Sequence, residues 1–134
     1  MAGNSSFSGY TENKILDHLI GKTSFVMPTV YIGLSTADPD EDASGLAEPS
    51  GNGYARVTTS GGTWSAASGG ITSNVSAIDF PSATGSWGAV THFVLFDALT
   101  NGNMLAYGEL TAPETITSGK IVRFSIGQLT ISLD

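Results

Sequence analysis

The chain contains no cysteine, few charged residues and no long hydrophobic run. Without cysteine it has no disulfide, no thiolate nucleophile and no cysteine-ligated zinc site. The longest apolar stretches are about five residues, far short of the roughly 20 that a membrane-spanning helix needs, so we expect no membrane partner. Only five basic residues oppose twelve acidic ones, and they are scattered, which argues against direct nucleic-acid binding.

Small polar residues dominate what remains. Gly, Ser and Thr occupy 49 of the 134 positions, and the net charge is −7. This composition is typical of proteins in which short strands meet at glycine-rich turns. The apolar content of 40% is sufficient for a core, and the length fits one domain.

The N-terminal segment predicts an arm followed by a short helix. Residues 1–10 are small and polar, and we expect them to form an N-terminal arm. Residues 11–21 predict a helix that Thr11 caps and Gly21 ends. Its apolar residues at helical spacing are Ile15, Leu16, Leu19 and Ile20. Because so short a helix is unstable alone in water, this face is expected to pack on the sheet or on another subunit.

Strand patterns account for most of the remaining chain. The expected strands cover residues 30–35, 54–59, 75–80, 90–97, 104–110, 115–117 and 122–133, with a weak one at 64–71. The strand at 90–97 is apolar on both faces and is therefore central. Asn101-Gly102 predicts a hairpin turn, and the apolar alternation changes phase at Gly127, where a strand passes between sheets. The predicted fold is all-β: a single-domain, jelly-roll-like β-sandwich over residues 11–134 that includes the one short N-terminal α-helix.

A long acidic loop at residues 36–53 is the clearest candidate for binding. It carries turn residues at both ends, and long ordered loops usually have a function. Asp38, Asp40 and Asp42 resemble the start of a calcium-binding loop. The sixth and twelfth positions of that loop should be Gly and Glu but are Ala43 and Pro49, so we expect no metal ion.

Residue patterns of catalysis are absent. No serine lies in a G-x-S-x-G context, and neither His18 nor His92 is accompanied by cysteine or a dense acidic cluster. We therefore expect no catalytic residue, no cofactor and no enzymatic activity. The aromatic residues Trp64, Trp87 and Tyr54 leave two interpretations open, stacking on sugars or packing in the core.

Three stretches, 12–22, 30–39 and 48–56 with its motif Gly53-Tyr54-Ala55-Arg56, resemble a family of small tailed-phage virion proteins. The resemblance continues through 80–88 and 91–97 and covers nearly the whole chain. It implies a phage structural protein, since members are labelled tail fibre proteins and proteins of this size also serve as capsid decoration, or cement, proteins.

Within that resemblance we expect a capsid decoration protein. The sequence has no repeat or heptad of a fibre shaft, whereas an arm and a long loop suit a protein that bridges capsid subunits. It would be made in the host cytoplasm, lie on the capsid surface of the virion, bind and stabilise the major capsid protein, and form a homo-oligomer, dimer or trimer. The alternative is a tail fibre or baseplate protein that binds host glycan. The expected partner contacts are Phe7, Tyr10, Lys14, His18, Asp38, Asp40, Asp42 and Tyr54.

Overall fold

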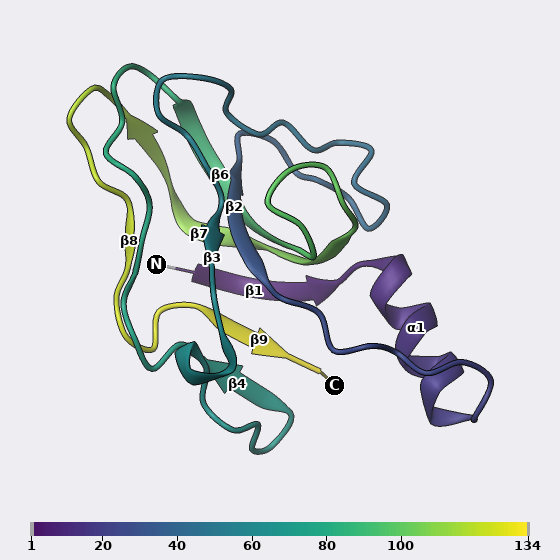
Figure 1. Ribbon diagram of the computed structural model, residues 1–134. Helices are drawn as coiled ribbons and strands as arrows, with labels where there is room; N and C mark the ends of the chain where they lie inside the picture. The colour runs from purple at the N-terminus through teal and green to yellow at the C-terminus, as the bar shows by residue number, and fades with distance from the viewer. Residues whose placement is uncertain (1, 134) are drawn as a thin grey trace.

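The computed structural model describes residues 2–133, with side chains from residue 6 onward, and its largest element is a five-stranded antiparallel sheet (Figure 1). The sheet has the order β1-β7-β6-β2-β3, made of β1 (Ala2–Phe7), β7 (Met104–Ile116), β6 (Gly88–Phe96), β2 (Tyr31–Ser35) and β3 (Val57–Thr58). Two antiparallel ribbons pair β4 (Ile71–Ser73) with β9 (Thr130–Ser132) and β5 (Ile78–Asp79) with β8 (Arg123–Phe124). The prediction of an all-β single domain with one short α-helix is confirmed.

The main core lies between the sheet and the two ribbons. Ile32 pairs with Leu95 and Leu34 with Phe93 across β2 and β6, and all four side chains are buried. Phe93 meets Phe124 of β8 edge-on, with ring centroids 6.2 Å apart. The layer opposite the large sheet consists of these two short ribbons.

The other face of the sheet is also covered, as the apolar pattern of residues 90–97 predicted. Val94, Phe96 and Met104 form a second buried cluster, and Ala43 and Leu46 of the acidic loop pack against it. The acidic loop therefore has a structural role, because it shields one face of β6 from water.

Glycine and asparagine set the predicted turns. Asn101 (φ 56°) and Gly102 (φ 76°) form the hairpin turn between β6 and β7. Gly127 (φ 79°) lies between β8 and β9, which belong to different ribbons, so the predicted passage between sheets at this glycine is confirmed. The long strand β7 joins the predicted strands 104–110 and 115–117.

Residues 2–7 form a strand, and the predicted arm at residues 1–10 is wrong over the part that the structure describes. Strand β1 pairs antiparallel with β7, with Ser6 opposite Tyr107 and Phe7 opposite Ala106. Small polar residues carry no strand periodicity, so this pairing could not be predicted from the residue pattern. The outer edge of β7 offers free N–H and C=O groups, and pairing them satisfies both backbones.

The helix α1 (Gly9–Leu19) begins earlier than predicted. Its cap is Ser8 instead of Thr11: the Ser8 side chain accepts from the Thr11 backbone N–H at 3.2 Å. At the other end Gly21 has φ 78°, its N–H donates to the His18 carbonyl, and the Lys22 N–H donates to the Asp17 carbonyl. These two bonds form the glycine-ended cap that the sequence predicted at Gly21.

Candidate functional site

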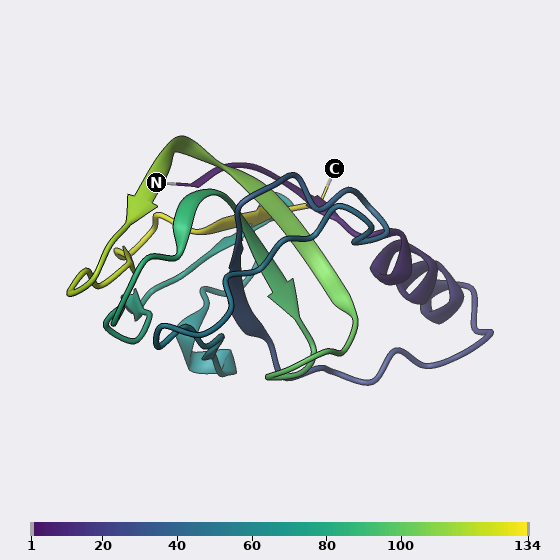
Figure 2. The same cartoon turned by 90° about the horizontal axis from the view of Figure 1, so that it is seen from above.

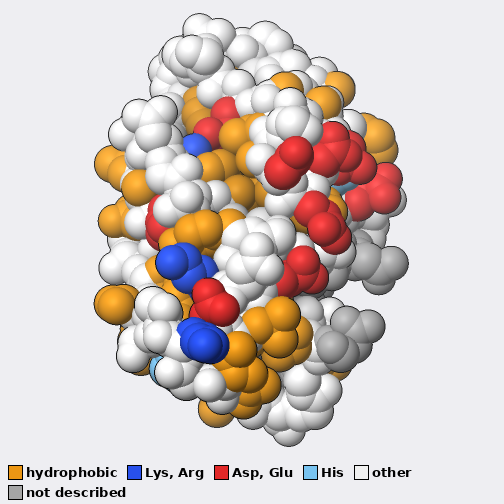
Figure 3. All heavy atoms as spheres, turned by 90° about the vertical axis from the view of Figure 1, so that its right-hand side faces the viewer, with side chains coloured by type: hydrophobic (Ala, Val, Ile, Leu, Met, Phe, Trp, Pro, Cys, Tyr) orange, Lys and Arg blue, Asp and Glu red, His pale blue; other side chains and the backbone are white. Residues whose placement is uncertain are grey.

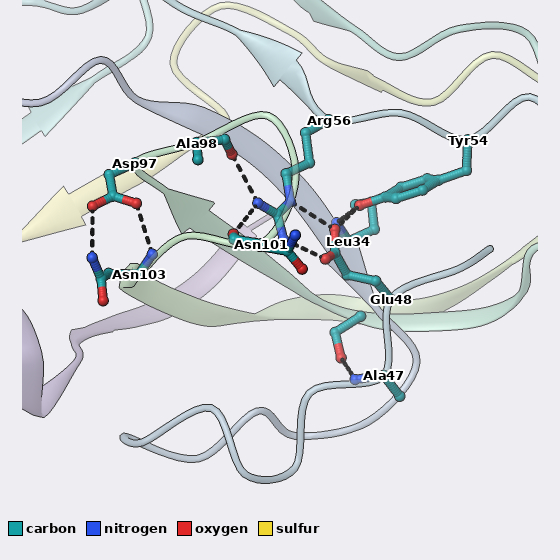
Figure 4. A network of polar contacts seen from close by, with 10 residues as sticks. Leu34, Ala47, Glu48, Tyr54, Arg56, Asp97, Ala98, Asn101 and Asn103 are labelled. Carbon is teal, nitrogen blue, oxygen red and sulfur yellow. Dashed lines mark hydrogen bonds and ion pairs between the residues drawn. The ribbon is translucent and has the colours of Figure 1, made fainter.

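The motif that ends the acidic loop builds a buried polar network. Glu48, Tyr54 and Arg56 flank the loop's final turn and converge beneath it (Figure 4). The Arg56 guanidinium donates to both Glu48 carboxylate oxygens, at 3.0 Å from Nε and 2.6 Å from Nη2. The Arg56 side chain is only 5% exposed and that of Glu48 19%, so this is a largely buried, bidentate ion pair.

Arg56 also joins the loop to the neighbouring hairpin. Its Nη1 donates to the carbonyls of Ala98 and Asn101, each at 2.8 Å, and its guanidinium lies 3.7 Å from the centre of the Phe96 ring. Asp97 stabilises the same hairpin by accepting from the Asn103 backbone at 2.7 Å. One arginine therefore connects the acidic loop, the hairpin turn and the sheet.

Tyr54 points into the protein. Its hydroxyl donates to Glu48 Oε2 at 2.6 Å and accepts from the Leu34 N–H at 3.0 Å. Burial and the neighbouring Glu48 carboxylate raise the pKa of Tyr54 above its ordinary value, since both disfavour the phenolate. The hydroxyl passes so close to β2 that a Cβ on Gly33 would lie 2.8 Å from it. This close approach explains the glycine inside the strand.

Two of the three aromatic side chains considered for sugar stacking belong to the core. The Tyr54 ring meets Trp87 edge-on at 5.3 Å, and Trp87 is 4% exposed, with its indole N–H donating to the Asn52 carbonyl. Trp64 is half-buried and packs against the main core. The hydroxyl of Tyr54 is committed to internal hydrogen bonds with Leu34 and Glu48, and its role as a partner contact stays a prediction.

A cleft of about 1080 Å³ lies between the start of α1, the acidic loop and the 97–104 hairpin. Tyr10, Asp40 and Asp42 line it together with Arg56, and Glu48 neutralises that arginine. The rim is therefore negatively charged, and Figure 3 shows acidic side chains gathered on the side of the molecule that carries α1. The predicted contact residues Tyr10, Asp40 and Asp42 thus lie at one cleft.

The carboxylates of the loop mainly hold their own backbone. Asp38 Oδ1 accepts from the Asp40 N–H and Asp42 Oδ1 from the Ser44 N–H, both at 3.0 Å. The side-chain and backbone bonds from Ser44 keep the pKa of Asp42 below its ordinary value. Within residues 2–133 there is no group of three or more His, Cys, Asp or Glu side chains placed to hold a metal ion. The side chains of Asp38 and Asp42 thus each form a local turn with the backbone two residues further along the chain.

The remaining predicted contacts belong to the N-terminal segment. Phe7 and Tyr10 are half-buried and pack against the main core. Lys14 lies over the Tyr10 ring at 5.6 Å from its centre. His18 is exposed, and its Nδ1 accepts from the Phe25 N–H at 3.0 Å, which ties the segment after α1 back to the helix.

Five of the eleven exposed large hydrophobic side chains that the structure describes lie on what we call the helical projection, residues 9–29. It extends from one side of the β body (Figure 2). Its exposed fractions are 56% for Leu16, 76% for Leu19, 65% for Ile20, 80% for Val26 and 91% for Met27. Of the two packing partners expected for the apolar helix face, the chain's own sheet does not cover Leu16, Leu19 and Ile20, and packing on another subunit stays a prediction. The sheet contacts the start of α1, where Thr11 is buried and Ile15 half-buried, and the end of the helix extends beyond these contacts. The spacing of the apolar residues predicts an apolar helix face, but it cannot show whether the rest of the chain covers that face.

Comparisons with known proteins place the chain in a family. No curated protein matches it. A family model described as "Podophage GP4 fiber I protein gp80" matches residues 6–132. No helix within residues 2–133 has the length and apolar character needed to cross a membrane. The family match confirms the resemblance to tailed-phage virion proteins, and its description names a fibre protein. The chain belongs to the family of the podophage GP4 fiber I protein gp80.

Proposed function

We propose that this phage structural protein is a non-enzymatic subunit of a tail fibre that acts by assembly through its helical projection. The observation that carries the proposal is the set of five apolar side chains on residues 16–27, each more than half exposed. Apolar surface gathered on one projecting element is typical of an assembly interface and not of a surface that stays in water. The fibre location is supported by the description of the matching family.

Capsid decoration is the second candidate, and the structure removes one of its supports. Its case relied on residues 1–10 reaching out to neighbouring subunits, and residues 2–7 instead complete the chain's own sheet. A role in glycan binding is likewise not favoured, because Trp87 and the hydroxyl of Tyr54 are committed to the interior. The net charge of −7 supports partners other than nucleic acid.

Cryo-electron microscopy of the intact particle tests the location. Density for this fold on the tail would support the fibre proposal, and density spread over the icosahedral head would replace it with decoration. A second test asks whether the helical projection is the assembly surface. Virions carrying Leu19→Ser are compared with virions carrying Ile126→Ser, which alters a side chain of similar exposure (76% and 66%) outside the projection.

Leu19→Ser should reduce incorporation by about tenfold or more, since burying one leucine side chain contributes about 1.5–3 kcal/mol. The control Ile126→Ser should be incorporated normally. Both positions are exposed, so both purified variants should keep the thermal unfolding curve of the parent protein. Equal incorporation of the two variants would refute the role of the projection.

A further inference from the structure

The helical projection has a charge balance unlike that of the rest of the chain. Residues 9–29 carry two acidic side chains, Glu12 and Asp17, and two basic ones, Lys14 and Lys22, and are therefore neutral overall. The remaining residues carry ten acidic and three basic side chains and account for the whole net charge of −7. Two copies of this protein repel each other over most approaches, and the projection itself adds no net charge to that repulsion.

The outward face of α1 has the pattern of a helix–helix contact. Leu16, Leu19 and Ile20 lie at i, i+3 and i+4 and are each more than half exposed. Glu12 lies one turn before this apolar group, and Lys22 lies just beyond it. Opposite charges at opposite ends make the face self-complementary when two such helices run antiparallel.

From this arrangement we infer that the helical projection binds the same projection of a second copy across a twofold axis, with the two α1 helices antiparallel. An axis between Asp17 and His18 places Leu16 of one copy opposite Leu19 of the other, and Glu12 of each beside Lys22 of the other. A twofold contact forms every such pair twice. The antiparallel order also sets the positive end of each helix dipole against the negative end of its partner. This inference rests on the assembly role proposed above and names the partner of that surface.

The contact is one helix wide. An 11-residue helix is about 16 Å long, so the interface is smaller than that of a permanent dimer. We therefore expect a weak dimer in dilute solution, with a dissociation constant in the micromolar range or above. It becomes populated when neighbouring copies are held together in a particle.

The absence of native cysteine provides a direct test with the full-length protein. Chains carrying Leu16→Cys and Leu19→Cys are mixed and oxidised, alongside each variant alone. The antiparallel contact brings residue 16 of one copy to residue 19 of the other, within the roughly 3.5–4.5 Å between Cβ atoms that a disulfide requires. The mixture should give mainly the heterodimer, and Ile126→Cys, exposed elsewhere, should remain monomeric. Homodimers in preference to the heterodimer would indicate a parallel contact, and no crosslink at either position would indicate no contact; either result overturns the inference.

A charge exchange gives an independent readout by sedimentation over a concentration series. Glu12→Lys and Lys22→Glu should each weaken association about threefold to tenfold, and the double variant should restore it, because the pairs are re-formed with reversed sign. Failure of the double variant to recover would contradict the Glu12–Lys22 pairing. Electron microscopy of the particle tests the proposed function separately from the crosslinks. Density on the tail without crosslinking would support the fibre location and refute the dimer. Crosslinking with density on the head would support the dimer and refute the fibre location.

Discussion

Replacing Glu48 by Gln should destabilise the fold far more than breaking a surface ion pair. The substitution keeps the shape of the side chain but removes the charge that neutralises Arg56, whose side chain is 5% exposed. Breaking a buried ion pair by changing one partner costs about 3–5 kcal/mol. Glu48 is itself 19% exposed, and Arg56 keeps its bonds to the Ala98 and Asn101 carbonyls, so we expect about 3 kcal/mol.

A matched control is present in the same molecule. Asp79 accepts from Arg123 with the same two-bond geometry, at 2.6 and 2.8 Å, but the two side chains are 42% and 59% exposed. Asp79→Asn removes an equivalent charge from a pair that water already screens. Its effect should therefore be a small fraction of the Glu48→Gln effect.

Urea unfolding followed by circular dichroism measures both variants. Since a domain of this kind is stable by about 5–15 kcal/mol, a loss of about 3 kcal/mol moves the midpoint clearly. The double variant Glu48→Gln with Arg56→Met should recover part of the loss, because no buried charge is then left unpaired. Equal, small effects of Glu48→Gln and Asp79→Asn would refute the reasoning and show that burial of the Arg56 pair adds nothing.

Three further predictions concern the interior. Gly33→Ala should lower the free energy of unfolding in urea by about 1–3 kcal/mol, since its Cβ would lie 2.8 Å from the Tyr54 hydroxyl. The loss should be smaller when Gly33→Ala is made in a chain that already carries Tyr54→Phe. An equal loss with and without Tyr54→Phe would contradict the close-approach argument. Asn74 is 1% exposed, donates to the Ser76, Phe124 and Ser125 carbonyls and accepts from the Leu129 N–H. Asn74→Ala should therefore lower the free energy of unfolding by about 2–3 kcal/mol and speed amide hydrogen exchange at residues 124–129. Unchanged exchange at these residues would contradict this role of Asn74. The pKa of Tyr54 is raised in the folded state, so above about pH 10 the unfolded chain releases a proton that the folded chain keeps. Stability should therefore fall as the pH rises beyond that value, and Tyr54→Phe should flatten the decline measured by unfolding at several alkaline pH values.

The acidic loop illustrates how a structural explanation changes the interpretation of a sequence motif. Residues 48–56, with the motif Gly53-Tyr54-Ala55-Arg56, carry part of the family resemblance and overlap a loop that is expected to bind a partner. Their contacts show that the pattern preserves an internal ion pair and a buried hydroxyl. The surface proposed for assembly lies instead on the helical projection, where the sequence shows only a short amphipathic helix.

A similar lesson comes from the C-terminal segment. The phase change at Gly127 was enough to predict that the chain passes between two sheets, because side-chain alternation and glycine conformation are local properties. The buried Asn74 that holds this passage in place was not recognised from the sequence. Its four hydrogen-bond partners, three of them about 50 residues away along the chain, come together only in the folded protein.

The sequence by itself determined the all-β class, the single short helix with its Gly21 end, the Asn101-Gly102 hairpin and the central position of residues 90–97. Each depends on spacing, turn chemistry or local backbone preference, which act within a few residues. Only the tertiary structure decided that residues 2–7 complete the sheet, that Tyr54 turns inward and that Leu16, Leu19 and Ile20 face water. Those outcomes depend on which surfaces meet across long stretches of chain, and one-dimensional patterns cannot specify the direction in which an amphipathic face points.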